Sequence, residues 1–394
     1  MYDGEWPKGA TRVRKETRAL AEAGHEVHLI ARNLANAPPR EEETWMTVWR
    51  LPRLPGRRTR YALNFPLFVN PIWLWRMWRV ARRAGADLVL VCDLPLAPSA
   101  VWLGRMLGVP VHYDMGEIYP EFLRSLRLTE RQGPLKRLIR TPRLAEGLER
   151  YVLRRVAAVY VVSPESRERC VGLGVPADRL VIVGNTPENL AELVQPRPVP
   201  VDIADLAREE RAILLFVGIL IADRGVADVI RALPTVQIRH PKATLVVVGD
   251  GPERKVLEET VSRLGLERSV RLVGWKAPEE LPGYYQASAI GLLPFRDSPH
   301  VRLTLANKLF DYMGAGLPVL ASDLPSMHRV LEETQAGRMH APDNPTDLAR
   351  VASGMLDDPA GRRILGENGR RAALTDYSWE HDAARLREAV ARLR

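Results

Sequence analysis

The chain has 394 residues, which is long enough for two domains that each bury their own core. Its 46% hydrophobic and 27% charged residues exclude a disordered or fibrous protein, and its two cysteines, Cys92 and Cys170, exclude a disulfide framework or a cysteine-rich metal site. The net charge is +9, and the excess lies in residues 1–200, which hold 31 Lys and Arg against 21 Asp and Glu and so indicate an anionic partner.

The first half of the chain alternates helical and strand patterns. Its expected elements are a helix and then a strand over residues 11–33, strands at 86–93 and 109–116 around a helix at 97–108, and a strand within 155–166. Apolar runs that alternate with amphipathic helices predict a parallel sheet covered on both faces. We therefore expect an α/β, Rossmann-like domain over residues 1–200, whose opening strand is reduced to Met1 and Tyr2.

Residues 57–85 interleave aromatic and basic side chains, with Trp73, Trp75 and Trp78 beside several arginines, and more basic residues follow at 127–143. This mixture suits peripheral contact with an anionic membrane, or a site for a lipid-linked diphosphate acceptor. The alternatives are that the tryptophans pack in the core and that the arginines are solvated helix faces. The N-terminus lacks the apolar region of a secretory signal, and no apolar run is long enough to span a bilayer. We expect a cytoplasmic protein that is at most peripheral at the inner face of the membrane.

The second half begins with a proline-rich stretch, residues 185–205, which predicts a hinge and a domain boundary near residue 200. Beyond it the expected strands are 212–220, 243–251, 270–275, 291–295 and 317–322, with helices at 225–240, 256–266, 281–290 and 307–316. This alternation predicts a second Rossmann-like domain over residues 201–376. We expect a terminal helix at 377–394 that packs back on the N-terminal domain.

Polar residues gather where the strands of the second domain end. Gly218 permits close backbone approach, and Arg224 places a cation at the start of the next helix, a combination that suits a phosphate group. Lys308 lies in the first turn of a helix with Asn307 as a candidate N-cap, where a cation is favourable only beside a bound anion. Asp311 follows on the same helix face and can accept hydrogen bonds from ribose hydroxyls. The alternative is a set of ordinary surface charges, but together these residues predict a diphosphate site.

Several segments of the chain occur in the order seen in one enzyme family. They include GHEVHLIAR, YDMGEIYPE, VVSPES, FVGILIADRGVADVIRAL, VVVGDGPERKVLEE, NKLFDYMGAGLPVLASD and YSWE. In these segments the sequence resembles retaining GT-B glycosyltransferases of family four, over almost the whole chain and most specifically over residues 212–380. The resemblance implies two Rossmann-like domains that face a cleft, with a nucleotide-sugar donor in the C-terminal domain and an acceptor in the N-terminal domain.

The resemblance also implies roles for individual residues. It assigns donor binding to Gly9 in a loop that closes on the phosphates, to Gly218, Arg224, Lys308 and the amides of Thr304, Leu305, Ala306 and Asn307 around the diphosphate, to Asp311 on the ribose, and to Gly274 and Trp275 near the base. The first acid of the family's acidic motif falls on Leu303, so His300 or Arg302 is the candidate for the donor sugar. Gly116 stands where a histidine is common, and Ile219 where Arg or Asn is common.

Glu117 and Asp114, at a strand end of the first domain, are the candidates for orienting the acceptor or the sugar; the alternative is that they only cap the loop. The departing nucleoside diphosphate gains negative charge, which fixed cations and helix N-termini stabilise. The resemblance implies front-face attack with retention, in which the leaving phosphate takes the acceptor's proton. We therefore expect no metal and no cofactor.

The sequence thus predicts a glycosyltransferase that moves a sugar from a UDP-, GDP- or similar nucleotide sugar to a glycan, lipid-linked or small-molecule acceptor. The predicted context is cell-envelope polysaccharide, glycolipid or other glycoconjugate biosynthesis. One alternative is a GT-B sugar-nucleotide epimerase, which would share the donor site and need no acceptor. A second is a basic nucleic-acid-binding protein, but the chain has no RNP-like, helix-turn-helix or zinc-finger pattern, so we expect no nucleic-acid partner.

Overall fold

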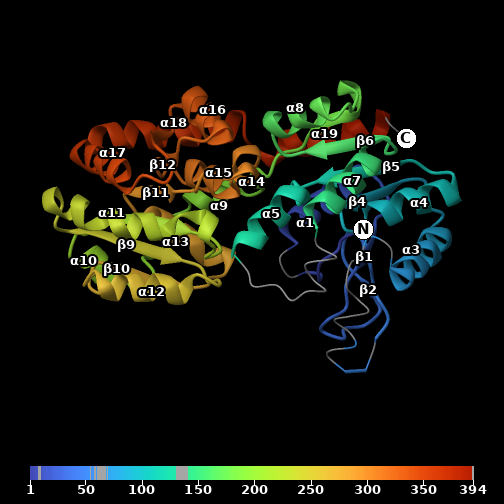
Figure 1. Cartoon of the computed structure of the whole chain (residues 1–394), viewed down its shortest axis with the longest axis horizontal. Coiled ribbons are helices and arrows are strands. Elements are labelled where there is room, and N and C mark those ends of the chain that lie inside the picture. The colour runs from blue at the N-terminus through green and yellow to red at the C-terminus, as the bar shows by residue number, and fades with distance from the viewer. Residues whose placement is uncertain are drawn as a thin grey trace. The chain divides into compact units, whose positions relative to one another are not determined.

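The computed structural model describes the chain except for residues 8–9, 54, 57–58, 60–67, 69, 130–140 and 393–394. Its residues form two compact units (Figure 1): unit 1 is Met1–Gly184 with Glu380–Arg394, and unit 2 is Asn185–Trp379. The chain therefore leaves unit 1 earlier than the boundary predicted near residue 200. Nearly all of the terminal helix α19 (Trp379–Arg392) belongs to unit 1. In the part of the chain that the structure describes, no helix combines the length and hydropathy needed to cross a bilayer.

Unit 1 is built on two sheets. One has the order β1–β3–β2, from β1 (His28–Ala31), β3 (Thr47–Arg50) and β2 (Arg40–Glu42), and the other has the order β4–β5–β6–β7, from β4 (Val89–Cys92), β5 (Val111–Met115), β6 (Ala158–Val161) and β7 (Leu180–Ile182). Every pairing is parallel except that of β2 with β3. The helices are α1 (Thr11–Glu22), α3 (Pro71–Ala84), α4 (Ala97–Leu107), α5 (Tyr119–Thr129), α7 (Pro142–Leu153) and α8 (Pro164–Gly172).

Residues 1–5 join these two sheets. The amide of Tyr2 donates to the carbonyl of Ile30 on β1 at 3.0 Å, and the carbonyl of Met1 accepts from the amide of Cys92 on β4 at 2.9 Å. Glu5 forms a parallel bridge with Arg32, just beyond β1. The opening residues therefore occupy the position between β1 and β4, which is where the first strand of the expected domain would lie.

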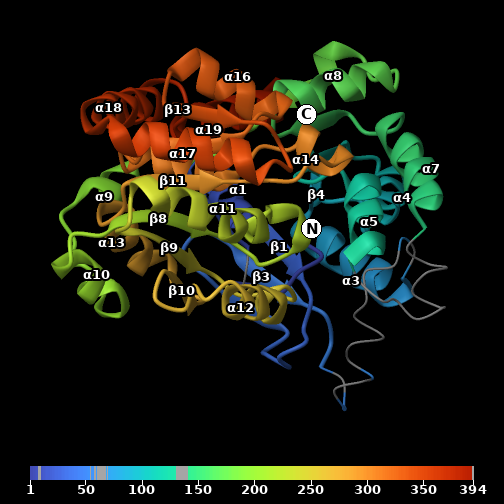
Figure 2. The same ribbon diagram turned by 60° about the vertical axis from the view of Figure 1, so that its left-hand side comes forward.

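Unit 2 contains one parallel sheet of six strands, in the order β10–β9–β8–β11–β12–β13. The strands are β8 (Ala212–Val217), β9 (Ala243–Val248), β10 (Val270–Gly274), β11 (Ile290–Leu293), β12 (Val319–Ser322) and β13 (Gly337–His340). The helices are α9 (Leu190–Val194), α10 (Ala204–Arg208), α11 (Val226–Arg239), α12 (Arg254–Arg263), α13 (Leu281–Gln286), α14 (Pro299–Leu303), α15 (Asn307–Gly314), α16 (Pro325–Thr334), α17 (Pro345–Asp357) and α18 (Pro359–Thr375). Figure 2 shows helices on both sides of these strands.

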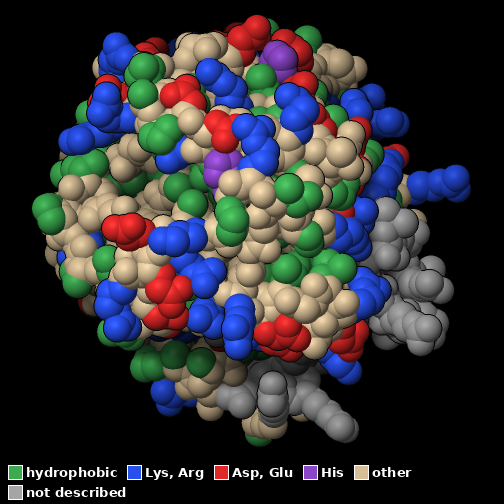
Figure 3. All heavy atoms as spheres, turned by 90° about the vertical axis from the view of Figure 1, so that its left-hand side faces the viewer, with side chains coloured by type: hydrophobic (Ala, Val, Ile, Leu, Met, Phe, Trp, Pro, Cys, Tyr) green, Lys and Arg blue, Asp and Glu red, His purple; other side chains and the backbone are tan. Residues whose placement is uncertain are grey.

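The core of unit 2 explains why its sequence is easy to interpret. All six residues of β9 are buried, as a central parallel strand covered by helices on both faces requires. The buried Leu190 of α9 packs against α15, because a β-carbon at Gly314 would lie 2.7 Å from its side chain. Residues predicted as a hinge therefore include a helix that packs on unit 2. On the face of the molecule drawn in Figure 3, basic and acidic side chains both occur across the surface.

Candidate functional site

The carboxyl ends of β8 and β11 meet at the point where the strand order of unit 2 reverses. A β-carbon at Gly225 would lie 1.8 Å from the carbonyl oxygen of Pro294, so the loops after the two strands touch through a glycine. A β-carbon at Gly249 would lie at the same distance from the carbonyl oxygen of Gly218. The backbones of Gly218 and Gly249 therefore approach each other closely, whereas the approach of a phosphate to Gly218 stays a prediction. In open α/β sheets, ligands bind at such a reversal.

Arg224 lies at this reversal point. It ends a short 3₁₀ helix, Ala222–Arg224, directly before α11, as the sequence predicts. Its guanidinium lies 4.3 Å from the centre of the Phe295 ring, which follows β11. The amide of Arg296 also donates to the carbonyl of Asp223 at 2.9 Å, which fixes one loop on the other. Arg224 therefore has a defined position between the two loops.

The segment from α14 to α15 is held by side-chain hydrogen bonds to its backbone. The Thr304 carbonyl accepts from the Ser326 hydroxyl at 2.7 Å, and the Thr304 hydroxyl donates to the His300 carbonyl at 3.1 Å. Leu305 and Ala306 are partly buried against the core of unit 2. The prediction that Asn307 caps the helix is wrong by one position, because Ala306 occupies the N-cap and Asn307 is the first helical residue.

Lys308 and Asp311 form the pair expected from their spacing. The Lys308 ammonium lies 2.5 Å from the Asp311 carboxylate, and the Tyr285 hydroxyl lies 3.5 Å from the same oxygen. Both charged side chains keep part of their surface exposed, 29% for Lys308 and 21% for Asp311. The pair is therefore partly buried at the start of α15, where its groups can exchange partners with a ligand.

The end of β10 presents an exposed aromatic ring. Gly274 has a φ of +81°, and the following Trp275 is 71% exposed. The Lys276 ammonium lies 2.6 Å from the Asp202 carboxylate, which also accepts a hydrogen bond from the Tyr284 hydroxyl at 2.6 Å. This network fixes the loop and leaves the indole of Trp275 as its exposed side chain.

The candidates for the donor sugar differ in their surroundings. Leu303 is half-buried at the end of α14, and His300 is half-buried in the same helix. Arg302 makes a two-point contact with Asp297, with nitrogen–oxygen distances of 2.5 and 2.6 Å. Arg302 is therefore already paired, whereas the prediction for His300 stays open. Gly9, predicted for the phosphate loop, lies outside the described residues.

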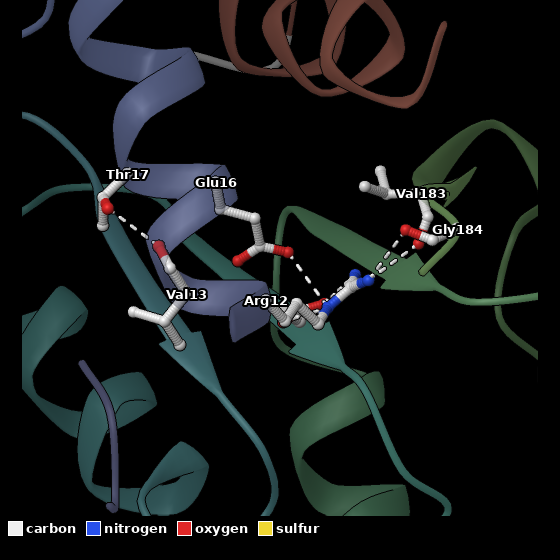
Figure 4. Close-up of polar contacts among 7 residues, drawn as sticks. Arg12, Val13, Glu16, Thr17, Val183 and Gly184 are labelled. Atoms are coloured by element: carbon white, nitrogen blue, oxygen red, sulfur yellow. Dashed lines mark hydrogen bonds and ion pairs between the residues drawn. The ribbon is translucent and has the colours of Figure 1, made fainter. Parts of the chain in front are cut away.

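Unit 1 contains a buried ion cluster that the sequence analysis did not identify (Figure 4). Arg12 of α1 lies 2.6 Å from the Asp114 carboxylate and 3.1 Å from that of Glu16, and its guanidinium donates to the carbonyls of Val183 and Gly184 at 3.0 and 3.2 Å. The side chains of Asp114 and Glu16 are each 2% exposed. Arg12 therefore ties α1 to the ends of β5 and β7, at the residues where the chain leaves unit 1.

The electrostatics of this cluster follow from burial and close charges. Burial lowers the pKa of Arg12, but the charges of Asp114 and Glu16 raise it further, so the net value is above the ordinary one. Burial and then the charge of Asp114 raise the pKa of Glu16 to about 8, against the opposing effect of Arg12. Glu16, Cys92 and Asp114 are close enough together to share a metal ion, but Arg12 already binds Asp114 and Glu16, and burial raises the pKa values of Glu16 and Cys92 so that both stay protonated, so the set does not fit a metal.

The two candidate acids of unit 1 lie in different surroundings. Asp114 is buried within β5 and bound by Arg12 of α1, whereas Glu117 is exposed between β5 and α5, so the orienting role and the loop-capping alternative both stay predictions. Asp93, which directly follows β4, was missed. Its Oδ1 atom is buried and has no hydrogen-bond partner among the described residues. The rule that located Arg224, a charged residue shortly after an apolar strand, would also have located Asp93.

Two family models match the chain. Residues 211–358 match the model "Glycosyl transferases group 1", and residues 9–186 match the model "Glycosyl transferase 4-like domain". Among solved structures, sucrose-phosphate synthase from Thermosynechococcus elongatus superposes with a TM-score of 0.76 at 22% identity, over 97% of this chain and 92% of that one. Anabaena HepE in complex with UDP-glucose superposes with a TM-score of 0.72 at 17% identity, over 99% and 98%. These likenesses show the fold.

Curated relatives match over different shares of their length. The 2-deoxystreptamine glucosyltransferase of Streptomyces kanamyceticus is 26% identical over 386 residues, 95% of this chain and 96% of that enzyme. The alpha-D-kanosaminyltransferase of the same organism is 26% identical over 247 residues, 60% and 61% of the two chains, so less than two thirds of that relative is spanned. Glycogen synthase of Mycobacterium tuberculosis is spanned over 39% of its length. Because the two family models together match most of the sequence, the chain belongs to the group 1 glycosyltransferases, and its fold is the GT-B fold of that family.

Proposed function

We propose that the protein transfers a sugar, with retention, from a nucleoside-diphosphate sugar to a hydroxyl of an acceptor in glycoconjugate biosynthesis. The observation that carries this proposal is the placement of Arg224 at the reversal point between β8 and β11, with the Lys308–Asp311 pair at the start of α15, the second helix after β11. Family membership and the UDP-glucose complex of a similarly folded protein support it. Unit 2 would bind the donor and unit 1 the acceptor.

The proposed chemistry assigns a task to each group. Arg224, Lys308 and the amides at the start of α15 stabilise the negative charge that develops on the departing diphosphate. Asp311 accepts hydrogen bonds from the ribose, and Trp275 stacks on the base at the end of β10. The acceptor hydroxyl attacks from the side of the leaving group, whose phosphate oxygen takes its proton. We propose that this chemistry needs no metal ion.

We also propose that unit 1 touches an anionic membrane surface through α3 and α4, which pack on each other. Trp73 is buried, as the core alternative requires, but Trp75 is 45% exposed with Arg79 over its ring, and Trp102 of α4 is 49% exposed. Exposed indoles beside guanidinium groups suit the headgroup region of a bilayer. The remaining parts of the predicted membrane segments, within residues 57–69 and 130–140, lie mostly outside the described residues.

Thermal protection by nucleotide sugars tests the donor assignment. We expect one of the UDP-, GDP- or ADP-sugars to raise the melting temperature, because a ligand that binds only the folded state stabilises it by an amount that rises with the logarithm of its concentration over its Kd. The protecting sugar nucleotide is then incubated with candidate acceptors, and the anomeric configuration of the product is read by NMR. Protection by none of the nucleotides contradicts donor binding, an inverted product contradicts retention, and conversion without an acceptor supports the epimerase instead.

A further inference from the structure

The sheet of unit 1 has a reversal point of its own. Met1 and Tyr2 pair with β1 on one side and β4 on the other, and the chain runs first to the β1 side, through α1, and later to the β4 side, through α3. The reversal point therefore lies between the Met1–Tyr2 position and β4. Asp3 directly follows Tyr2, and Asp93 directly follows β4. Two carboxyl groups therefore border the place where ligands of open α/β sheets bind.

Asp93 is the better defined of the two. Its backbone adopts a φ of +62°, which is uncommon for a residue other than glycine, and its amide donates to the Asp114 carbonyl at 2.9 Å. Its buried Oδ1 atom has no hydrogen-bond partner in the described part of the chain. A β-carbon at Gly116 would lie 3.5 Å from this oxygen and 3.6 Å from Cδ of Arg12, so the glycine lies beside the Asp93 carboxyl and the Arg12 side chain borders the same space.

The charges around Asp93 are mostly negative. Burial and then the charges of Asp3 and Glu117 raise the pKa of Asp93 well above its ordinary value, while Arg12 opposes the rise. Burial raises the pKa of Asp3 to about 6 despite the neighbouring Arg32. The guanidinium of Arg12 is already bound to Asp114 and Glu16. A cation placed beside Asp93 would therefore reduce the repulsion between the Asp93 carboxylate and the neighbouring acids, which Arg12 offsets only in part.

The acids near Asp93 do not form a compact metal site. Among the described residues, the carboxyl oxygens of Asp3, Asp93 and Glu117 do not form a cluster tight enough to enclose a single metal ion; the set that does is Glu16, Cys92 and Asp114. The cation to consider is therefore an organic molecule with an ammonium group and hydroxyls. Such a molecule can reach Asp93 with the ammonium and the neighbouring acids with its hydroxyls.

We propose that the acceptor of this enzyme carries an amino group, and that the Asp93 carboxylate binds its ammonium at the reversal point of unit 1. This inference rests on the proposed function only in identifying the ligand as the acceptor, since the binding itself needs no donor. Asp93 is a specificity residue here and takes no part in bond breaking. When the ammonium binds, a proton leaves Asp93, because a neighbouring cation favours the ionised carboxylate.

The test compares two compounds that differ in one group: scyllo-inosamine, which has one amine, and scyllo-inositol, which has a hydroxyl in its place. We expect calorimetry of the whole protein at neutral pH to give inosamine an affinity at least tenfold higher, as a charge-assisted hydrogen bond implies. Titrations in two buffers of different ionisation enthalpy should show proton release with inosamine. This measurement uses the unmodified protein and so does not depend on any variant's folding.

The variant Asp93→Asn should remove the preference and the proton release while keeping the fold, since Asn tolerates a positive φ. The matched control is Asp178→Asn, an exposed acid in the turn before β7, at the opposite edge of the sheet, which should leave both unchanged. Equal affinities for the two compounds, no binding of inosamine at millimolar concentration, or a preference that survives in Asp93→Asn would each overturn the proposal. Nucleotide protection is measured separately, so a protein that binds inosamine but no nucleotide sugar would refute only the proposed transfer.

Discussion

The carboxyl edges of the two main sheets carry opposite chemistry at the same topological position. In unit 2 the reversal point is bordered by Arg224, with Lys308 on the helix beyond it. In unit 1 the reversal point is bordered by Asp3 and Asp93, and Asp114 on the neighbouring strand β5 is paired with Arg12. A departing diphosphate needs cations, and an amine-bearing acceptor needs carboxylates, so the contrast matches the division of labour proposed for the two units.

This contrast shows that the net charge of a domain does not report the chemistry of its site. Residues 1–200 hold the basic excess of the chain, yet the ligand edge of that half is acidic. Much of the excess lies on other surfaces: the guanidinium groups of Arg40, Arg76 and Arg83 surround the ring of Trp49, each within 5.4 Å of its centre. A basic half therefore does not by itself indicate a basic binding site.

The largest effect should come from removing the guanidinium that binds the buried acids of unit 1. In Arg12→Met, Asp114 and Glu16 remain buried and lose the arginine that binds both of them, and we expect the free energy of unfolding to fall by roughly 3–5 kcal/mol, measured by urea denaturation. The control is Arg18→Met on the same helix, where the Arg18–Glu22 pair is about half exposed and should contribute under about 1 kcal/mol. Similar losses of unfolding free energy in both variants would mean that the buried ion cluster stabilises the fold no more than an exposed ion pair does.

These two arginines also show which contacts the sequence does not predict. Arg12–Glu16 and Arg18–Glu22 are both Arg–Glu pairs four residues apart on one helix, and the pattern alone does not distinguish them. The two pairs differ because Arg12 also binds Asp114, which lies on a strand about a hundred residues later in the chain. Contacts of that kind are set by the packed tertiary structure.

Strands were predictable where burial on both faces left a continuous apolar run. The strands β8, β9 and β12 fall inside their predicted spans for this reason. The edge strand β10 also falls inside its predicted span, although only Val270 of its residues is buried. The strand β13, with the sequence Gly-Arg-Met-His, was not predicted, since two of its four residues keep some exposure and the run has no apolar continuity. In the site, the spacing of Lys308 and Asp311 predicted their contact because it is local to one helix, whereas the short hydrogen bond from Ser326 to Thr304 is not local and left no pattern.

The second effect concerns the basic edge of unit 2. Replacing Arg224 by Gln should lower kcat about 100-fold, because removing one donor from a preorganised charge site costs about that much, and Lys308→Gln should act similarly. Turnover is measured with the donor that the protection assay identifies. The control is Arg363→Gln on α18, whose side chain is 74% exposed and paired at 3.9 Å with Glu367, and which should leave turnover unchanged. Full activity in Arg224→Gln would contradict the proposal that Arg224 stabilises the departing diphosphate.

The last effect is a change in pH dependence at the acidic edge of unit 1. Because burial and Asp114 raise the pKa of Glu16 to about 8 in the folded protein, the folded state keeps a proton that the unfolded state releases near its ordinary pKa of about 4.5. The stabilisation from protonated Glu16 is therefore complete at low pH and is lost as the pH rises towards 8. In Glu16→Gln this loss disappears, so the variant should gain about 3–4 kcal/mol on the unmodified protein between about pH 5 and pH 8.

Urea unfolding at several pH values in that range measures this gain directly. Asp3 and Asp93 also have raised pKa values and add to the pH dependence of both proteins, so the difference between the two curves isolates Glu16. Glu22→Gln, an exposed substitution on the same helix, should give a difference that does not change with pH. If the Glu16→Gln difference were also flat, Glu16 would be ionised throughout, and the single charge of Arg12 would be shared between two carboxylates. Arg12 would then offset less of the negative charge around Asp93, and the edge would attract an ammonium more strongly.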